Sequence, residues 1–215
     1  MPTYLYLHGF ASSPQSAKAQ YLSARFAECG ESLRILDLNQ GGFCHLTLSR
    51  QLAQAKAALP LQEPAIAIGS SFGGLTVAWL AEQCPQIERL IGLAPAFNFL
   101  PTWRSRLSAT QWQQWQTTRR LSVYHYGEQR QQELDYGFIE DLANYDETAL
   151  QRPLPTLILH GRQDAIVPIQ AARDYQRDRP WVELVQLDSD HSLGNVRPQI
   201  WQAIARFCPE LALAG

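Results

Sequence analysis

The stretch that decides the fold is AIAIGSSFGGL, residues 65–75. It begins as a run of small and branched apolar residues, which is typical of a strand buried on both faces of a parallel sheet. It then places two serines among three glycines and continues into an apolar helical pattern. Glycines at this point indicate a tight turn from a strand into a helix, because larger side chains would collide with the neighbouring backbone.

The turn fits the pattern G-x-S-x-G only with Ser71 as the central serine, because Ser70 would require glycine where Ile68 stands. A serine on such a turn is lifted into the open on a strained backbone. The N-terminus of the following helix also favours negative charge that develops beside it. We therefore predict that Ser71 is a nucleophile and that Ser70 is a neighbour that lines the site or bonds locally.

Short apolar runs and helical patterns alternate along most of the chain. The runs that predict buried strands are 3–8, 33–38, 65–70, 90–94, 156–161 and 182–187. The segments that predict helices are 14–28, 47–58, 72–84, 168–177 and 195–207. This alternation predicts an α/β fold with a doubly wound, mostly parallel sheet of about six strands.

Residues 96–152 interrupt this rhythm, because a single helix would suffice between the strands on either side. The segment holds ten of the 22 aromatic residues. We interpret it as a small helical lid insertion in a single domain, 1–215, whose core is formed by 1–95 and 153–215. The alternative is an ordinary pair of packing helices.

Two polar residues follow the fifth and sixth predicted strands, at the sheet edge where ligands bind in such folds. Asp164 can accept a hydrogen bond from a histidine ring and fix its tautomer. Asp164 follows Ser71 by 93 residues and His191 follows Asp164 by 27, so serine, acid and histidine occur in the order that a hydrolase of this fold requires. We predict that His191 is the base and that Asp164 orients it.

Other residues near these two leave alternatives open. Asp188 or Asp190 could replace Asp164 as the acid, although both are more readily interpreted as loop or capping residues. His160, at the end of the fifth predicted strand, is expected to be structural and is the weaker candidate for the base.

The loop after the first predicted strand, LHGFASSPQS (7–16), is a candidate for stabilising an oxyanion. Acyl transfer requires two backbone N–H donors for the oxyanion. We expect these from Phe72, which follows the nucleophile, and from Phe10 in this loop. Gly9 would let the loop approach the substrate, and His8 is expected to tie the loop to a neighbouring backbone group.

Composition excludes several functions. The net charge is −2, and the only lysines are Lys18 and Lys56, so nothing favours nucleic acid as a partner. The four cysteines are scattered without a C-x-x-C pair, and we expect them to be reduced, mostly buried and without metal. The N-terminus has no signal-peptide pattern, and no apolar run is long enough for stable membrane insertion. We therefore expect a cytoplasmic protein.

Four segments together resemble the α/β-hydrolase superfamily, and more narrowly the small bacterial YqiA-like esterases. They are LHGFASS (7–13), AIGSSFGG (67–74), LILHGRQDAIVP (157–168) and DSDHSL (188–193). The resemblance implies hydrolysis of acyl esters by Ser71, His191 and Asp164 without a cofactor or metal. It also implies a sheet without the two N-terminal strands of larger members, in the spatial order 2-1-3-4-5-6.

These observations together predict a serine hydrolase acting on a small-molecule ester with a small to medium, partly apolar acyl group. Trp103, Trp112 and Trp115 in the insertion are candidates for contacting that group. The nearest alternative is a thioesterase that uses the same residues. A hydrolase-like module that only binds a ligand or partner is a third possibility, because fold does not dictate function.

Overall fold

A computed structural model describes residues 2–212 and contains one six-stranded parallel sheet. The spatial order is β2-β1-β3-β4-β7-β8, and every neighbouring pair is parallel. The strands are β1 (Thr3–Leu7), β2 (Leu33–Leu36), β3 (Ala65–Ser70), β4 (Ile87–Leu93), β7 (Thr156–Gly161) and β8 (Val182–Leu187). The predicted α/β class, the six strands and the strand order implied by the resemblance are confirmed.

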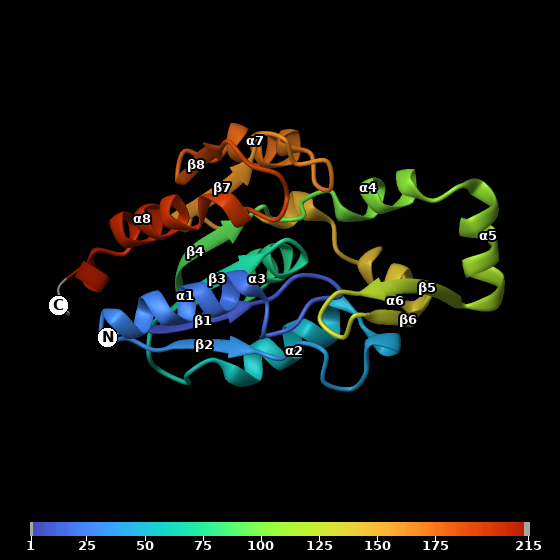
Figure 1. The fold of residues 1–215 in the computed structure, drawn as a ribbon, viewed down its shortest axis with the longest axis horizontal. Coiled ribbons are helices and arrows are strands. Elements are labelled where there is room, and N and C mark those ends of the chain that lie inside the picture. Colours follow the sequence, from blue (N-terminus) through green and yellow to red (C-terminus); the bar gives the residue numbers. More distant parts are fainter. Residues whose placement is uncertain (1, 213–215) are drawn as a thin grey trace.

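Helices cover both faces of this sheet, as the doubly wound prediction requires (Figure 1). Helices α1 (Ala17–Glu28) and α8 (Arg197–Phe207) contribute their buried residues to the apolar core on one face. Helices α2 (Leu48–Ala58), α3 (Phe72–Gln83) and α7 (Ile169–Arg177) contribute to the core on the other. All five lie where the sequence predicts helices, with starts that differ by up to three residues.

Strand β3 lies between β1 and β4 near the middle of the sheet, and all six of its residues are buried. Its small and branched apolar side chains suit this position, since helices pack on both faces of the strand. The helix that follows, α3, is buried over most of its length, from Phe72 to Ala81. The turn between β3 and α3 is therefore held by rigid, packed elements on both sides.

The insertion contains helices as predicted, but it also contains an antiparallel pair of strands that the sequence analysis missed. Its elements are α4 (Phe99–Arg106), α5 (Ala109–Thr118), β5 (Arg120–His125), β6 (Arg130–Asp135), α6 (Gly137–Leu142) and a 3₁₀ turn at Glu147–Ala149. The two strands are RLSVYH and RQQELD, whose polar residues hide the apolar alternation that marks a half-buried strand.

Figure 1 shows α4, α5 and the β5–β6 pair extending beyond the end of the sheet at which β3 and β4 terminate. Trp115 of α5 is fully buried, and its Nε1 donates to the carbonyl of Leu134 in β6 at 3.0 Å. Both residues belong to the same apolar core as one face of the sheet. On the other side of the insertion, Arg106 donates to the carbonyls of Ala165 and Ile166, which joins α4 to the loop after β7.

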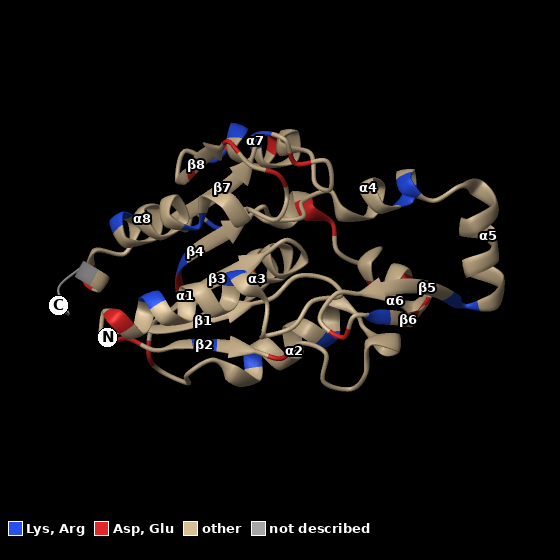
Figure 2. Ribbon diagram, in the orientation of Figure 1, with Lys and Arg blue, Asp and Glu red and all other residues tan. Residues whose placement is uncertain are grey.

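The charged residues, the cysteines and the helix lengths indicate no further specialised region in residues 2–212. Figure 2 shows acidic and basic residues scattered along the helices and loops, with no continuous run of one sign. The four cysteines are free, Cys84 and Cys208 buried and the other two half-buried. Within residues 2–212, no helix combines the length and the apolar character needed to cross a bilayer.

Candidate active site

Ser71 occupies the turn between β3 and α3 in a backbone conformation with φ 54° and ψ −118°. A residue with a side chain rarely adopts this region, and doing so costs about 1–3 kcal/mol. Two hydrogen bonds, one to the end of β4 and one to the loop that follows it, hold Ser71 there. The Ser71 N–H donates to the Leu93 carbonyl at 2.9 Å, and the Ser71 carbonyl accepts from the Ala96 N–H at 3.0 Å. The strained turn predicted from the sequence is therefore present.

The glycines at 69 and 73 are required by the close approach of backbone to backbone. A Cβ atom on Gly69 would overlap the carbonyl of Gly73. A Cβ atom on Gly73 would overlap the carbonyls of Leu7 and His8 at the end of β1. These overlaps confirm the steric reason for the glycines that the sequence analysis proposed.

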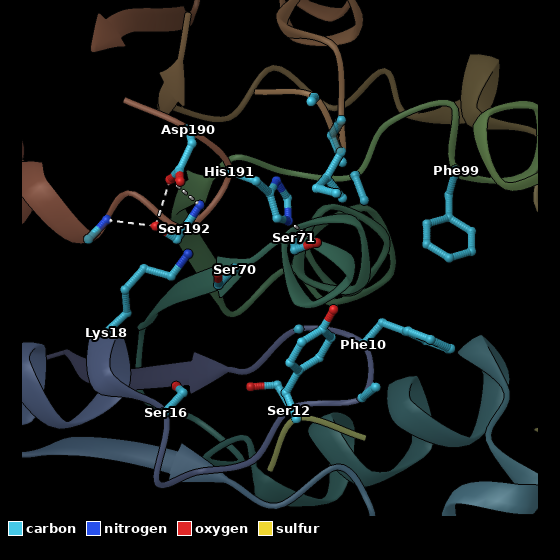
Figure 3. Close-up of a pocket in the computed structure, with 18 of the residues that line it drawn as sticks. Phe10, Ser12, Ser16, Lys18, Ser70, Ser71, Phe99, Asp190, His191 and Ser192 are labelled. Carbon is cyan, nitrogen blue, oxygen red and sulfur yellow. Dashed lines mark hydrogen bonds between the residues drawn. The ribbon is translucent and has the colours of Figure 1, made fainter. Parts of the chain in front are cut away.

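His191, in the loop after β8, lies between Ser71 and Asp164. Its Nε2 is 3.0 Å from the Ser71 Oγ, and its Nδ1 is 2.7 Å from the Asp164 Oδ2. Figure 3 shows the imidazole standing directly beside Ser71 at the edge of the cavity. The fold thus brings together three residues that are 93 and 27 positions apart in the sequence.

The Asp164 carboxylate is fully buried but well supplied with donors. Its Oδ1 accepts from the N–H groups of Ile166 and Val167 at 2.8 and 2.7 Å, while its Oδ2 faces His191. Burial by itself would raise the pKa of Asp164. Hydrogen bonds from His160, His191 and the backbone outweigh burial and hold that pKa well below its ordinary value. The carboxylate therefore stays ionised throughout the physiological range.

His160 has a part in this arrangement that the sequence analysis missed. It is fully buried at the end of β7, and its Nε2 lies 2.9 Å from the Val167 carbonyl and 3.1 Å from the Asp164 Oδ2. Both neighbours are acceptors, so Nε2 carries the hydrogen and faces both of them. The residue is structural, as expected, but it acts on Asp164. The spacing of four residues across a strand-ending turn was the signal for this contact.

Within residues 2–212, neither of the alternative acids forms an ion pair with the His191 ring, whose carboxylate partner is Asp164. Asp188 accepts from the side chain of Gln163, and Asp190 accepts from the backbone and hydroxyl of Ser192. These contacts fit the loop and capping roles expected for both residues.

The loop after β1 runs directly beside Ser71. A Cβ atom built on Gly9 would lie 3.2 Å from the Ser71 Cβ. The Phe10 N–H makes no backbone hydrogen bond within residues 2–212. Phe72 is the first residue of α3, so its N–H has no intrahelical partner. Two free N–H donors thus flank the serine, in the positions suggested for an oxyanion.

His8 fixes the path of this loop. Its Nδ1 donates to the Gly9 carbonyl at 2.9 Å, and its Nε2 accepts from the Leu38 N–H at 3.1 Å. Burial lowers the pKa of His8, which keeps the ring neutral and Nε2 available as an acceptor. The structural role predicted for His8 is confirmed.

A cavity of about 930 Å³ opens over Ser71 and His191. Trp103 lines it together with Phe10 and Phe99, as the sequence analysis suggested. Trp112 and Trp115 are not among its lining residues, so the suggestion that they contact the substrate is corrected. Trp115 is enclosed between α5 and the β5–β6 pair, and Trp112 packs under the guanidinium of Arg104 at 4.4 Å.

The described part of the chain contains no group of three or more His, Cys, Asp and Glu side chains arranged to hold a metal ion. The polar groups around Ser71 are instead a histidine, a buried carboxylate and backbone N–H donors. This set is suited to nucleophilic attack on a carbonyl carbon, with proton transfer by the imidazole.

Several solved structures have a similar architecture. Est1E from Butyrivibrio proteoclasticus, solved with ferulic acid, is similar with a TM-score of 0.83 and 20% identity, covering 99% of this chain and 90% of that one. Alpha/beta hydrolase domain-containing protein 10 from mouse is similar with a TM-score of 0.76 and 21% identity, covering 98% and 91%. The esterase domain of a Rhodothermus marinus protein is similar with a TM-score of 0.68 and 23% identity, covering 95% of this chain and 86% of that one. These likenesses establish the fold.

Family membership comes from the sequence itself. No curated protein matches the chain. A family model described as "Uncharacterised protein family (UPF0227)" matches residues 3–208, which is nearly the whole length. The chain therefore belongs to UPF0227, the YqiA-like family, and its fold is that of the α/β hydrolases.

Proposed function

We propose that the protein is a serine hydrolase that cleaves carboxylic esters through an acyl-enzyme intermediate. One observation carries this proposal: Ser71 Oγ, on a strained turn, lies 3.0 Å from His191 Nε2, while Asp164 accepts from Nδ1 of the same ring at 2.7 Å. A serine hydroxyl is a weak nucleophile unless an adjacent base takes its proton. The arrangement supplies that base and a buried carboxylate to orient it.

In the acylation step, Ser71 Oγ attacks the ester carbonyl and its proton passes to His191 Nε2. The carbonyl oxygen becomes an oxyanion, which the N–H groups of Phe10 and Phe72 stabilise. Asp164 stabilises the imidazolium that has formed. Collapse of this intermediate breaks the bond to the alcohol oxygen, which takes the proton from His191 and leaves as the alcohol.

In the deacylation step, a water molecule replaces the alcohol. His191 takes a proton from this water as its oxygen attacks the acyl carbon bound to Ser71. The second oxyanion occupies the same pair of N–H groups. Its collapse breaks the bond to Ser71 Oγ, which regains a proton from His191, and releases the carboxylic acid.

The cavity walls support a partly apolar substrate. Phe10, Phe99 and Trp103 line the space beside Ser71, and their rings contact one another. Such walls favour small to medium acyl groups with apolar or aromatic character. The similar Est1E structure was solved with ferulic acid, an aromatic acid, and this agrees with the proposed substrate class.

A fluorophosphonate probe and a short activated ester test the proposal together. We expect the probe to label Ser71 in the folded protein. We expect Ser71→Ala to abolish labelling and to lower turnover of 4-nitrophenyl butyrate by several powers of ten. Ser70→Ala is the matched control, because Ser70 is adjacent and lines the same cavity. Wild-type turnover by Ser71→Ala would overturn the proposal, and failure of the probe would favour a non-catalytic binding module.

The same groups would also cleave a thioester, since the chemistry differs only in the leaving atom. Matched oxygen and sulfur esters with the same acyl chain separate these reactions. We expect the higher kcat/KM with the oxygen ester. A large preference for the sulfur ester would identify the protein as a thioesterase.

A further inference from the structure

The cavity has two chemically different sides, which lie on either side of Ser71 (Figure 3). The side already described is aromatic and contains Phe10 and Phe99. The other side, reached from α1 and from the loop after β8, is polar. Its labelled residues in Figure 3 are Ser16, Lys18, Ser70, Asp190 and Ser192. A simple apolar ester would leave this polar side unused.

Lys18 is the unpaired cation of the cavity. Figure 3 shows its side chain extending from α1 towards the loop of Asp190 and Ser192. Within residues 2–212, its ammonium makes neither an ion pair within 4.0 Å nor a hydrogen bond, in contrast to the two arginines that line the same cavity. Arg106 donates to two backbone carbonyls, and Arg197 donates to the Gly194 carbonyl at 3.1 Å.

The neighbouring carboxylates, Asp190 and Asp164, act on the charge of Lys18 without a direct ion pair. Asp190 is occupied by the N–H and hydroxyl of Ser192, at 2.9 and 2.6 Å. Asp164 is occupied by His191 and the backbone. Burial lowers the pKa of Lys18 to about 8, although both carboxylates oppose the shift. The ammonium is therefore mostly charged at neutral pH, partly removed from water, and without a direct partner.

Tyr6 supplies a second polar group on the same side of the cavity. Its side chain is fully buried beside the hydroxyls of Ser16 and Ser70 and lines the cavity, yet its own hydroxyl makes no hydrogen bond of normal geometry within the described chain. A buried polar group without a partner is costly unless something completes it. Burial raises the pKa of Tyr6 to about 12, so the phenol is an O–H donor at any physiological pH.

We infer that this side of the cavity binds a carboxylate of the ester substrate, with Lys18 forming the ion pair and Tyr6 donating a hydrogen bond. This inference rests on the proposed function. A singly charged group matches one ammonium, whereas a phosphate dianion would face Asp190 with too little positive charge. The substrate is thus amphiphilic: its apolar part lies against Phe10 and Phe99, and its carboxylate lies on the other side of the reacting carbonyl.

Matched pairs of esters test this inference. The first pair is 4-(butyryloxy)benzoate and the neutral 4-(butyryloxy)benzamide, which differ in the leaving group. The second pair is mono-4-nitrophenyl glutarate and 4-nitrophenyl pentanoate, which differ in the acyl group. In at least one pair we expect Lys18→Met to lower the ratio of anionic to neutral kcat/KM by about 10- to 100-fold, as for a lost charged hydrogen bond. An unchanged ratio in both pairs would overturn the inference.

Two control variants make the result specific. Lys18→Arg keeps the charge and should retain most of the ratio. Lys56→Met removes the only other lysine, which lies on α2 and does not line the cavity, and it should leave the ratio unchanged. Equal losses in Lys18→Met and Lys56→Met would assign the effect to overall charge and overturn the inference.

A binding measurement separates this inference from the proposed function. In the Ser71→Ala background, 4-(butyryloxy)benzoate should raise the melting temperature more than the benzamide, and Lys18→Met should remove the difference. This outcome without any ester turnover by the wild type would refute the hydrolase and leave the carboxylate site standing. Turnover of neutral esters without any charge-dependent binding would refute the carboxylate site and leave the hydrolase standing.

Discussion

The Nε2 of His160 lies 3.1 Å from the Oδ2 of Asp164, the same oxygen that faces the Nδ1 of His191 at 2.7 Å. One carboxylate oxygen is therefore flanked by two histidines, one fully buried and the other at the cavity. The second oxygen accepts two backbone N–H groups. His160 completes the set of donors around the carboxylate, and we expect it to act as a positioning residue.

Removal of the His160 ring should impair turnover through Asp164. We expect His160→Leu to lower kcat by about 10- to 100-fold with little change in KM, because small displacements of catalytic groups carry costs of this size. His160→Gln, whose amide can approximate the Nε2 donor, should restore much of the loss. Steady-state kinetics on 4-nitrophenyl butyrate measure both variants. Equal activity of the Leu and Gln variants would show that the donor to Asp164 has no part in positioning.

Asp164→Asn should have a larger effect on turnover. An amide in this position can present an N–H to His191 Nδ1 and so favour the wrong tautomer, which in a comparable site lowers kcat by about 10⁴-fold. The matched control is Asp188→Asn, which changes another carboxylate of the neighbouring loops that lies outside the cavity. It should retain nearly full activity. A reversal of these two results would assign the role of the acid to Asp188.

Acid should weaken the fold through the same carboxylate. The pKa of Asp164 is held below its ordinary value of 3.8 in the folded state. Its contribution to stability is therefore fully present above that value and is lost as the pH falls below it. Urea unfolding should find Asp164→Asn less stable than the wild type by about 2 kcal/mol near neutral pH. The difference should shrink below about pH 4, and a constant difference would contradict this origin.

The parallel sheet was predictable because buried strands and their helices differ clearly in apolar pattern. Ser71, Asp164 and His191 were predictable for a related reason: parallel strands end at one edge, so loops distant in the sequence meet there. The β5–β6 pair was not predicted, because the polar residues of its strands hide their apolar alternation. The contact of His160 with Asp164 was also missed. The spacing of four residues across a strand-ending turn permits it, but the same spacing also fits a histidine that only packs in the core.

The sequence also did not distinguish which tryptophans of the insertion line the cavity. Trp103, Trp112 and Trp115 are equivalent by composition, but only Trp103 lines the cavity. The difference depends on how the insertion folds onto the β5–β6 pair, because that pair encloses Trp115. Long-range packing of this kind leaves no local signal in the sequence.

The turn at Ser71 should tolerate no side chain at position 73. We expect Gly73→Ala to destabilise the protein by about 3 kcal/mol or more, because the added Cβ would overlap the backbone of β1. Gly42→Ala is the control. Gly42 has φ +84° and ψ 139° but open space around it, so only the backbone conformation is penalised, by about 1–3 kcal/mol. Urea denaturation compares them, and an equal loss in both variants would refute the steric explanation.

The preference for an anionic ester should depend on pH through Lys18. Asp164 and Asp190 act on the charge of Lys18, and His191 and Tyr6 line the same cavity. Both carboxylates are ionised well below neutral pH, and burial keeps the Tyr6 phenol protonated. As the pH rises through about 8, Lys18 loses its proton and with it the positive charge. The kcat/KM for the anionic ester should therefore fall relative to that for its neutral partner, as measured between about pH 6 and pH 10.

Lys18→Arg identifies the group responsible for this decline. A guanidinium stays protonated over the whole range, so the ratio of anionic to neutral kcat/KM should become independent of pH in this variant. Taking the ratio removes any pH dependence of the reaction that both esters share. Arg106 and Arg197 also line the cavity, but they remain charged throughout and cannot produce the decline. A decline that persists in Lys18→Arg would assign it to another group and remove Lys18 from substrate recognition.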